Sequence, residues 1–276
     1  MMKDIFRQTL SQPPQSAPDG RKGSIVLVGA GPGAADLLTL RALNRLREAE
    51  VIFYDRLVDP EELELANPKA ERVYVGKAVG NCAWPQDKIC EMIVAEALKG
   101  RRVLRLKSGD PGIFGRATEE LEAARAEGIA VEIVPGVTAA CAAAAAAGRS
   151  LTERGVSDAL VLTTGMNRAG DPLPEATRHA QPGTAYAFYM AVAQATRIRD
   201  GLIGLGLPGT APVTVAVEVS KPGQRVLECT LKTLPETLEQ QGVIGCATLL
   251  VTWPKTDAAT QNAARRNAAK STAPVA

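Results

Sequence analysis

A repeated order of apolar strand, glycine-rich turn and helix restricts the fold of this chain more than any other feature. Residues 24–28 (Ser-Ile-Val-Leu-Val) form a continuous apolar run, which is typical of a strand buried on both faces of a sheet. Gly29–Gly33 follows as a turn, and Leu37–Leu43 then has apolar residues at helical spacing. Because such a strand needs helices on both sides, the pattern predicts an α/β fold with a largely parallel sheet.

The same signals continue along the chain and divide it into two halves. Further strands are expected at Val51–Asp55, Arg72–Lys77, Val103–Leu106, Val131–Val134, Leu160–Thr164, Ala185–Met190, Val213–Val217 and Thr248–Thr252. Helices are expected at about residues 86–98 and over the alanine run that stops at Gly148. We predict two α/β domains, residues 23–136 and 137–254, between a polar, proline-rich flexible leader (1–22) and a disordered tail (255–276).

Composition narrows the class of partner. The net charge of +2 is nearly balanced, which argues against nucleic acid as a partner but allows a local arginine cluster to meet an anionic ligand. The five cysteines form no CxxC pair, and their odd number fits a reducing compartment better than disulfides or a structural metal site. No apolar stretch has the length of a signal peptide or a membrane span. We expect a cytoplasmic protein without metal, membrane or nucleic-acid binding.

The stretch Arg105–Arg116 is the first candidate site. An apolar strand enters a loop in which Gly109, Gly112 and Gly115 permit positive φ and close backbone approach, and Asp110 adds a carboxylate. The loop is interpreted as a turn that cradles a ligand. An ordinary strand-to-helix crossover has the same features, so the residues alone leave both readings open.

A second glycine loop suggests a different ligand. The pattern Gly29-x-Gly31-x-x-Ala34, with Asp55 at the end of the next strand, satisfies a loose dinucleotide fingerprint in which the acid would hold ribose hydroxyls. Pro32 removes a backbone donor where a pyrophosphate would be bound. An NAD-dependent oxidoreductase therefore remains an alternative.

Several short motifs occur in one order along residues 23–253. They are Val28–Gly33 with Leu37–Leu40, Tyr54–Val58, Val75–Lys77, Arg105–Arg116, Val134–Ala139, Leu151–Arg154, Thr164–Gly165 and Tyr189–Met190. Together they resemble the tetrapyrrole (corrin and porphyrin) methyltransferase family, and within it the branch that methylates uroporphyrinogen III. The resemblance implies two α/β domains with S-adenosyl-L-methionine bound in the cleft between them, usually in a homodimer.

The resemblance also implies which residues contact the cofactor. Carried over residue by residue, they are Pro32, Ser108, Gly109, Asp110, Ile113, Thr138, Ala139, Met190, Val213 and Thr214. Physical chemistry agrees with part of this set, because a carboxylate such as Asp110 can meet the ammonium group of the methionine moiety and apolar side chains can flank adenine.

The implied reaction is S-adenosylmethionine-dependent C-methylation of uroporphyrinogen III at C2 and C7, which gives precorrin-2 and S-adenosyl-L-homocysteine. This acidic tetrapyrrole carries eight carboxylates, so arginines should bind it, and Arg56, Arg116 and Arg154 stand at motif positions. Asp55 is a candidate base, and Glu119 is placed one helical turn from Arg116 and could hold it. His179 lies outside every motif, and we expect no catalytic role for it.

Four departures from the family pattern keep alternatives open. Gly31–Ala35 reads Gly-Pro-Gly-Ala-Ala instead of ending in Asp-Pro, Ser108 replaces a glycine, Gly112 replaces a bulky residue, and Met166 stands where histidine is common. The first departure favours another corrin-pathway enzyme, such as a precorrin-4 C11-methyltransferase. A tetrapyrrole carrier or regulator with a degenerate site is the non-enzymatic alternative. The downstream pathway, whether sirohaem, cobalamin or haem d1, stays open.

Overall fold

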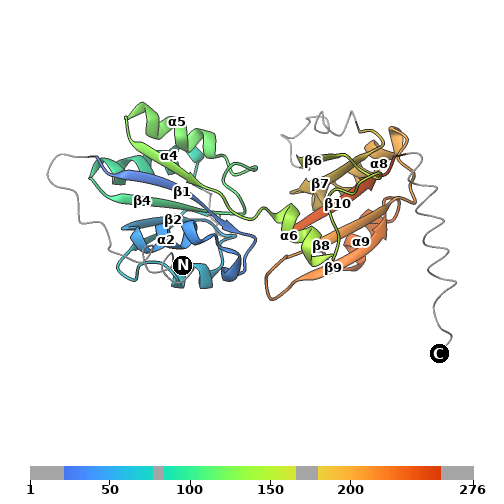
Figure 1. Ribbon diagram of the computed structural model, residues 1–276, viewed down its shortest axis with the longest axis horizontal. Coiled ribbons are helices and arrows are strands. Elements are labelled where there is room, and N and C mark those ends of the chain that lie inside the picture. Colours follow the sequence, from blue (N-terminus) through green and yellow to red (C-terminus); the bar gives the residue numbers. More distant parts are fainter. Residues whose placement is uncertain (1–21, 77–83, 166–179, 256–276) are drawn as a thin grey trace, which may run out of the picture. The chain divides into compact units, whose positions relative to one another are not determined.

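The computed structural model describes residues 22–76, 84–165 and 180–255 (Figure 1). The predicted leader and tail, Lys77, Met166 and His179 lie outside these residues, except for Lys22 and Lys255. The chain divides into two compact units, residues 1–138 and 139–276, where the sequence predicts a boundary after residue 136. Each unit is described by itself.

The first unit is built on a five-stranded sheet. Its strands are β1 (Ser24–Gly31), β2 (Val51–Tyr54), β3 (Glu71–Tyr74), β4 (Arg102–Ser108) and β5 (Ala130–Val134), in the order β3-β2-β4-β1-β5. Every pairing is parallel, with Ser24 opposite Arg102 and Val28 opposite Leu106. The predicted α/β fold with a parallel sheet is confirmed.

Helices cover both faces of this sheet, as Figure 1 shows for α2 on one side and α4 and α5 on the other. They are the 3-10 helix η1 (Ala35–Leu37), α2 (Leu40–Glu48), α3 (Pro60–Glu64), α4 (Gln86–Leu98) and α5 (Ala117–Ala126). The helix predicted from Leu37 begins three residues later, because the hydroxyl of Thr39 caps α2 by accepting a hydrogen bond from the amide of Ala42.

Strand alternation separates two cores. Ile25, Leu27 and Val103 pack with α4 and α5, whereas Val28 and Leu104 pack with α2 on the other face. Adjacent strands β1 and β4 are thus followed by helices on opposite faces. Ligands of open α/β sheets bind beyond the carboxyl ends of strands at such a point, which directs attention to the loops after β1 and β4.

The second unit contains a mixed five-stranded sheet. Its strands are β6 (Ala159–Thr164), β7 (Thr184–Tyr189), β8 (Pro212–Val217), β9 (Arg225–Thr230) and β10 (Ala247–Trp253), in the order β6-β7-β10-β8-β9. β6 and β7 are parallel, whereas β10 runs antiparallel to β7 and β8, and β9 antiparallel to β8. The sequence reading missed β9, since Arg225 and Glu228 interrupt its apolar pattern at the sheet edge.

Two groups of helices pack against this second sheet. The 3-10 helix η2 (Val192–Gln194), α8 (Ala195–Gly204) and α9 (Leu234–Gln240) build a core with β7, β8 and β10. The predicted alanine helix is α6 (Ala139–Ala146), which lies against β10, and its small side chains permit close approach. In the described part of the chain, no helix is long and apolar enough to cross a bilayer.

Candidate functional site

Three loops meet at the carboxyl edge of the first sheet. They follow β1, β4 and β5, which are neighbours in the sheet although far apart in the sequence. Gly31 and Gly109 exchange two backbone hydrogen bonds, at 3.2 and 2.6 Å, and the amide of Gly136 donates to Oδ2 of Asp110 at 3.0 Å. The backbone of all three loops is therefore held together without bulky side chains.

Glycine is required where the end of β1 meets the loops after β4 and β5. A Cβ atom on Gly136 would lie 2.2 Å from the carbonyl oxygen of Gly109, and one on Gly29 would lie 2.6 Å from the same oxygen. Gly109 itself adopts φ +73°, a left-handed conformation that favours glycine, and a Cβ there would meet no atom within 4 Å. The edge thus presents backbone groups to a ligand.

Asp110 organises this edge. Its Oδ1 accepts a hydrogen bond from the amide of Gly112 at 2.8 Å, while Oδ2 accepts the bond from Gly136. The predicted role was a charge partner for a ligand ammonium, and the two amide bonds add a structural role. Each carboxylate oxygen keeps a second lone pair, so both roles are compatible.

Strained backbone gathers in loops after strands. Among the described residues other than glycine, positive φ occurs at Phe114, Arg116, Met190, Glu218 and Ser220, with values from 46° to 58°. The first two follow β4, Met190 follows β7, and the last two follow β8. Left-handed non-glycine residues cost free energy and persist where surrounding structure enforces them, so these loops are functional candidates.

The predicted pair of Arg116 and Glu119 is present. Arg116 precedes α5, is exposed, and its Nε donates to Oε1 of Glu119 at 2.8 Å. This hydrogen bond is the largest factor that lowers the pKa of Glu119. This bond uses Nε of Arg116, and both side chains are exposed. The Nη1 and Nη2 groups of Arg116 can therefore donate hydrogen bonds to an anion from solution.

A buried charge cluster lies beneath this edge, on the face covered by α4 and α5. It consists of Arg105 and Lys107 on β4, Glu120 on α5, Gln86 on α4 and Asp55 after β2. Nζ of Lys107 donates to both oxygens of Glu120 at 2.8 Å, Nε of Arg105 donates to Oε1 at 3.2 Å, and Glu120 is fully buried. Arg105, Lys107 and Glu120 are therefore buried together, and Asp55 joins them from a part-exposed position.

Burial is the largest influence on the pKa of Lys107. Desolvation lowers the pKa of Lys107, and the positive charge of Arg105 acts in the same direction, while Glu120 opposes both. Without Glu120 the buried Lys107 would lose its carboxylate partner, and Asp55 alone would face two cations.

The sequence reading placed Arg105 in a motif but selected Glu119 and missed Glu120. A usable signal existed. Arg105 and Lys107 occupy alternate positions of the predicted strand and its continuation, so their side chains share one face of the sheet, where a covering helix would need an acid to neutralise them. Glu120 lies on the buried stripe of α5 with Ala117 and Ala124, at helical spacing.

In the second unit, β6, β7 and β8 run in the same direction, so their carboxyl ends share an edge. The amide of Gly165 donates to the carbonyl of Tyr189 at 2.7 Å, and the amide of Ala140 donates to the Tyr189 hydroxyl at 3.1 Å. The start of α6, with Ala139, is thereby tied to the loop that carries Met190.

The structure does not bring Val213 and Thr214 to this edge. They are the second and third residues of β8, toward the end opposite Glu218. Val213 is fully buried in the core, and the buried Thr214 hydroxyl accepts from Arg149 at 3.1 Å and donates to Glu228 at 2.8 Å. Strand polarity, which a linear motif does not reveal, separates them from Met190.

The remaining predicted residues are distributed as follows. Pro32 is buried in the loop after β1, Ile113 is half-buried in the loop after β4, and Ser108 ends β4. Arg56 is exposed beside Asp55, Thr138 is half-buried just before α6, and Arg154 is exposed in the turn before β6. Within the residues that the structure describes, no group of three or more His, Cys, Asp or Glu side chains could hold a metal ion.

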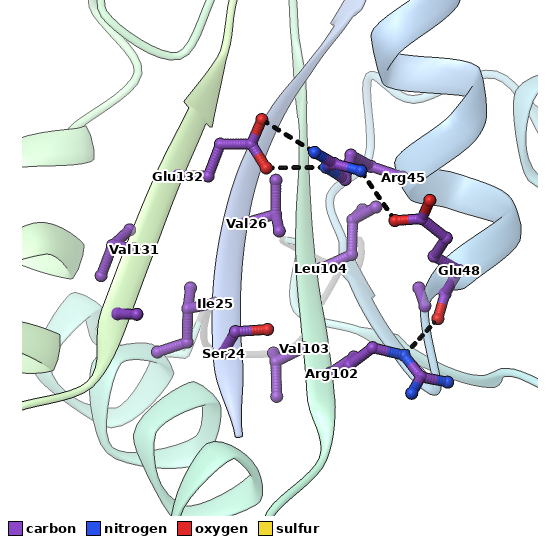
Figure 2. A pocket seen from close by; sticks show the side chains of 12 residues that line it. Ser24, Ile25, Val26, Arg45, Glu48, Arg102, Val103, Leu104, Val131 and Glu132 are labelled. Carbon is purple, nitrogen blue, oxygen red and sulfur yellow. Dashed lines mark hydrogen bonds and ion pairs between the residues drawn. The ribbon is translucent and has the colours of Figure 1, made fainter. Parts of the chain in front are cut away.

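A hollow of about 270 Å³ lies elsewhere, between α2 and the amino-terminal halves of β1, β4 and β5 (Figure 2). Nε and Nη2 of Arg45 donate to Glu132 at 2.7 and 3.3 Å, and Nη1 donates to Glu48 at 2.8 Å. Nε of Arg102 donates to the backbone carbonyl of Glu48. These charges satisfy one another at the end of the sheet opposite the glycine loops, so the hollow is not the candidate site.

Two α/β units, one with a parallel sheet whose glycine loops meet at its carboxyl edge, define the class of small-molecule enzymes that bind ligands at strand ends. Residues 24–235 match the family model of tetrapyrrole (corrin/porphyrin) methylases. The chain belongs to this family, and the resemblance predicted from the motifs is confirmed.

Two comparisons concern a siroheme synthase and a uroporphyrin-III C-methyltransferase. The siroheme synthase of Tolumonas auensis is 44% identical over 220 residues, which cover 80% of this chain and 47% of that protein. A uroporphyrin-III C-methyltransferase from Thermus thermophilus, solved with S-adenosyl homocysteine, is 35% identical with a TM-score of 0.71, over 83% of this chain and 97% of that one.

A third comparison concerns a sibling activity. A cobalt precorrin-4 methyltransferase of cobalamin biosynthesis has a TM-score of 0.73 at 27% identity, over 83% of this chain and 95% of that one. This chain spans about half the length of the siroheme synthases it matches.

Proposed function

We propose that this protein transfers methyl groups from S-adenosyl-L-methionine to C2 and C7 of uroporphyrinogen III, giving precorrin-2 and S-adenosyl-L-homocysteine. The observation that carries the proposal is the glycine-lined edge formed by the loops after β1, β4 and β5 in a member of this family. The 35% identity to a uroporphyrin-III C-methyltransferase solved with S-adenosyl homocysteine supports the same substrate pair.

The residues at this edge fit the methyl donor. Crossing glycines expose backbone donors and acceptors, Asp110 offers a carboxylate to the ammonium group, and Ile113 offers an apolar surface. Contacts from Pro32, Ser108 and Gly109 belong to the same proposal. So do Thr138, Ala139 and Met190, whereas the burial of Val213 and Thr214 at the far end of β8 supports these two less.

The protein groups then have distinct tasks. The donor, when bound, supplies a methyl group on a positively charged sulfur. Arg56, Arg116 and Arg154 are proposed to bind substrate carboxylates, which orients an electron-rich pyrrole carbon for attack. Asp55, part-exposed at the end of β2, is proposed to accept a ring proton after the carbon–carbon bond forms.

A direct assay tests the proposal. Purified protein is incubated anaerobically with uroporphyrinogen III and S-adenosylmethionine labelled in the methyl group. We expect two labelled methyl groups per tetrapyrrole and the absorption spectrum of a precorrin-2 derivative. Absence of label in the tetrapyrrole, with folded protein, would exclude the reaction, and a carrier would retain the tetrapyrrole unmodified.

A second candidate is C11-methylation of precorrin-4. It is favoured by the TM-score of 0.73 to the cobalt precorrin-4 methyltransferase and by the Gly-Pro-Gly-Ala-Ala sequence of Gly31–Ala35. The lower identity of 27% weighs against it. Label transfer to precorrin-4 but not to uroporphyrinogen III would select it, and NADH formation from NAD⁺ with a bound substrate would instead indicate the oxidoreductase.

Replacing Asp110 by asparagine should weaken donor binding and loosen the loop edge. The amide nitrogen of asparagine cannot accept a hydrogen bond, so one of the bonds from Gly112 and Gly136 is lost at a cost of about 1.5–3 kcal/mol. Calorimetry with S-adenosyl-L-homocysteine and urea unfolding measure the two effects. Asp87→Asn, an exposed acid in the first turn of α4, is the control, and an Asp110 variant that behaves like it would remove Asp110 from the site.

Replacing Arg116 by lysine should reduce turnover while S-adenosylmethionine affinity holds. Lysine keeps the charge but lacks the planar fork that binds a carboxylate through two hydrogen bonds. Steady-state kinetics and donor calorimetry separate the outcomes. Equal losses of donor affinity and turnover would mean that Arg116 only shapes the loop before α5, and unchanged kinetics would make it a surface residue.

The proposal extends to assembly and compartment. A homodimer is proposed from the family resemblance, and sedimentation of the purified chain tests it. A cytoplasmic location is supported by four free cysteines among the described residues, Cys90, Cys141, Cys229 and Cys246.

A further inference from the structure

All three guanidinium nitrogen atoms of Arg105 donate hydrogen bonds. Only 5% of its side chain is exposed, and it lies opposite Phe53 in the pairing of β2 with β4. Nη1 donates to the carbonyls of Leu106 at 2.8 Å and Phe53 at 3.4 Å, and Nε donates to Glu120. The remaining nitrogen, Nη2, donates to Oδ2 of Asp55 at 3.2 Å. The guanidinium plane is thus fixed by backbone and by a buried acid.

Asp55 is the accessible end of the cluster. Its side chain is 29% exposed, whereas that of Glu120 is fully buried. Oδ1 accepts a hydrogen bond from the amide of Leu57 at 3.3 Å, so each oxygen has one donor from the protein. Of the two carboxylates in the cluster, Asp55 is therefore the one that a substrate can reach.

Charge balance explains why the Asp55 carboxylate stays beside Arg105. The cluster holds two cations, Arg105 and Lys107, and Glu120 supplies a single compensating charge. Oε1 of Glu120 is already shared among Arg105, Lys107 and Gln86, and Oε2 is taken by Lys107. The second carboxylate that neutralises the cluster is Asp55, and its attraction to the buried Arg105 holds it at the end of β2.

We infer that Arg105 is a positioning residue for the reaction, which holds the Asp55 carboxylate in one orientation at the carboxyl edge of β2 and keeps its accessible face toward the substrate. Glu120 fixes Arg105 in turn. This inference rests on the proposed function of Asp55 as proton acceptor. It adds a buried arginine that acts through Asp55 and not through the donor or the substrate.

A double-mutant cycle tests the inference. Steady-state kinetics are measured for wild type, Arg105→Gln, Asp55→Asn and the double variant, with circular dichroism as the folding check. We expect Arg105→Gln to lower kcat roughly 10- to 100-fold with little change in KM, because a displaced group loses effective alignment. In the Asp55→Asn background, the same change should cost nothing further. Losses that multiply in the double variant would overturn the inference.

Two further variants separate positioning from general damage. Arg105→Lys keeps a positive charge beside Glu120 and should fold, but it lacks the fork and should still lose turnover. Gln86→Leu removes a donor to Glu120 at 3.1 Å without touching Asp55, and its kcat should stay near wild type. A loss in Gln86→Leu as large as in Arg105→Gln would contradict a role through Asp55.

If wild-type protein fails to methylate uroporphyrinogen III, the proposed function is wrong, but the positioning role of Arg105 can still be tested by structure. Crystal structures of wild type and Arg105→Lys are then compared at Asp55. A rotated Asp55 carboxylate in the variant supports positioning by Arg105, and an unchanged carboxylate overturns it.

Discussion

Replacing Glu120 by glutamine is expected to lower the free energy of unfolding of the first unit by about 3–5 kcal/mol, because the change removes the carboxylate that pairs with the buried Lys107 and leaves Arg105 with Asp55 alone. Glutamine preserves the shape of the side chain, so the loss reports charge. The neighbouring change Glu119→Gln removes only an exposed pair with Arg116 and should cost less than about 0.5 kcal/mol.

Urea unfolding can be restricted to the first unit. The chain has two tryptophans, Trp84 in the first unit and Trp253 in the second. In a Trp253→Phe background, fluorescence reports Trp84 alone, which avoids treating two units as one transition. Equal midpoints for Glu120→Gln and Glu119→Gln would show that the buried cluster does not stabilise the fold.

Replacing Gly136 by alanine is expected to separate the loops of the glycine edge and to abolish tight binding of S-adenosyl-L-homocysteine. The new Cβ would lie 2.2 Å from the carbonyl oxygen of Gly109 and 2.9 Å from two backbone atoms of Gly29. No flexible side chain can move aside, so the backbone must shift, at a cost of about 1–3 kcal/mol. Donor affinity should fall at least about tenfold if the shift costs binding 1.4 kcal/mol or more.

The control is Gly245→Ala, since a Cβ on Gly245 meets nothing within 4 Å and its φ is not positive. Calorimetry with S-adenosyl-L-homocysteine and urea unfolding should give wild-type values for this variant. A Gly136→Ala protein with unchanged affinity would show that the donor does not bind at the crossing of these loops.

Local pattern was sufficient for much of the fold. The α4 helix has the predicted bounds, Gln86–Leu98, and β1 lies where the β-branched run predicts a strand, since both depend on side-chain periodicity within one segment. The loop glycines were also predictable, because Gly29, Gly109 and Gly136 follow predicted strands. Motif order then identified the family without any knowledge of distances.

Only tertiary structure decided which side chains share a site. Asp55, Arg105 and Glu120 come from three elements, and their pairing depends on the strand order β2-β4 and on which face α5 covers. The sequence alone selected Glu119 because it lies one helical turn from Arg116, whereas the packing of α5 decides that the adjacent Glu120 faces the sheet. Val213 was assigned to the ligand from the motifs, whereas the structure places it second in β8, toward the end of the strand away from Met190. Chain order specifies local periodicity, whereas sheet order and strand direction determine which distant residues meet.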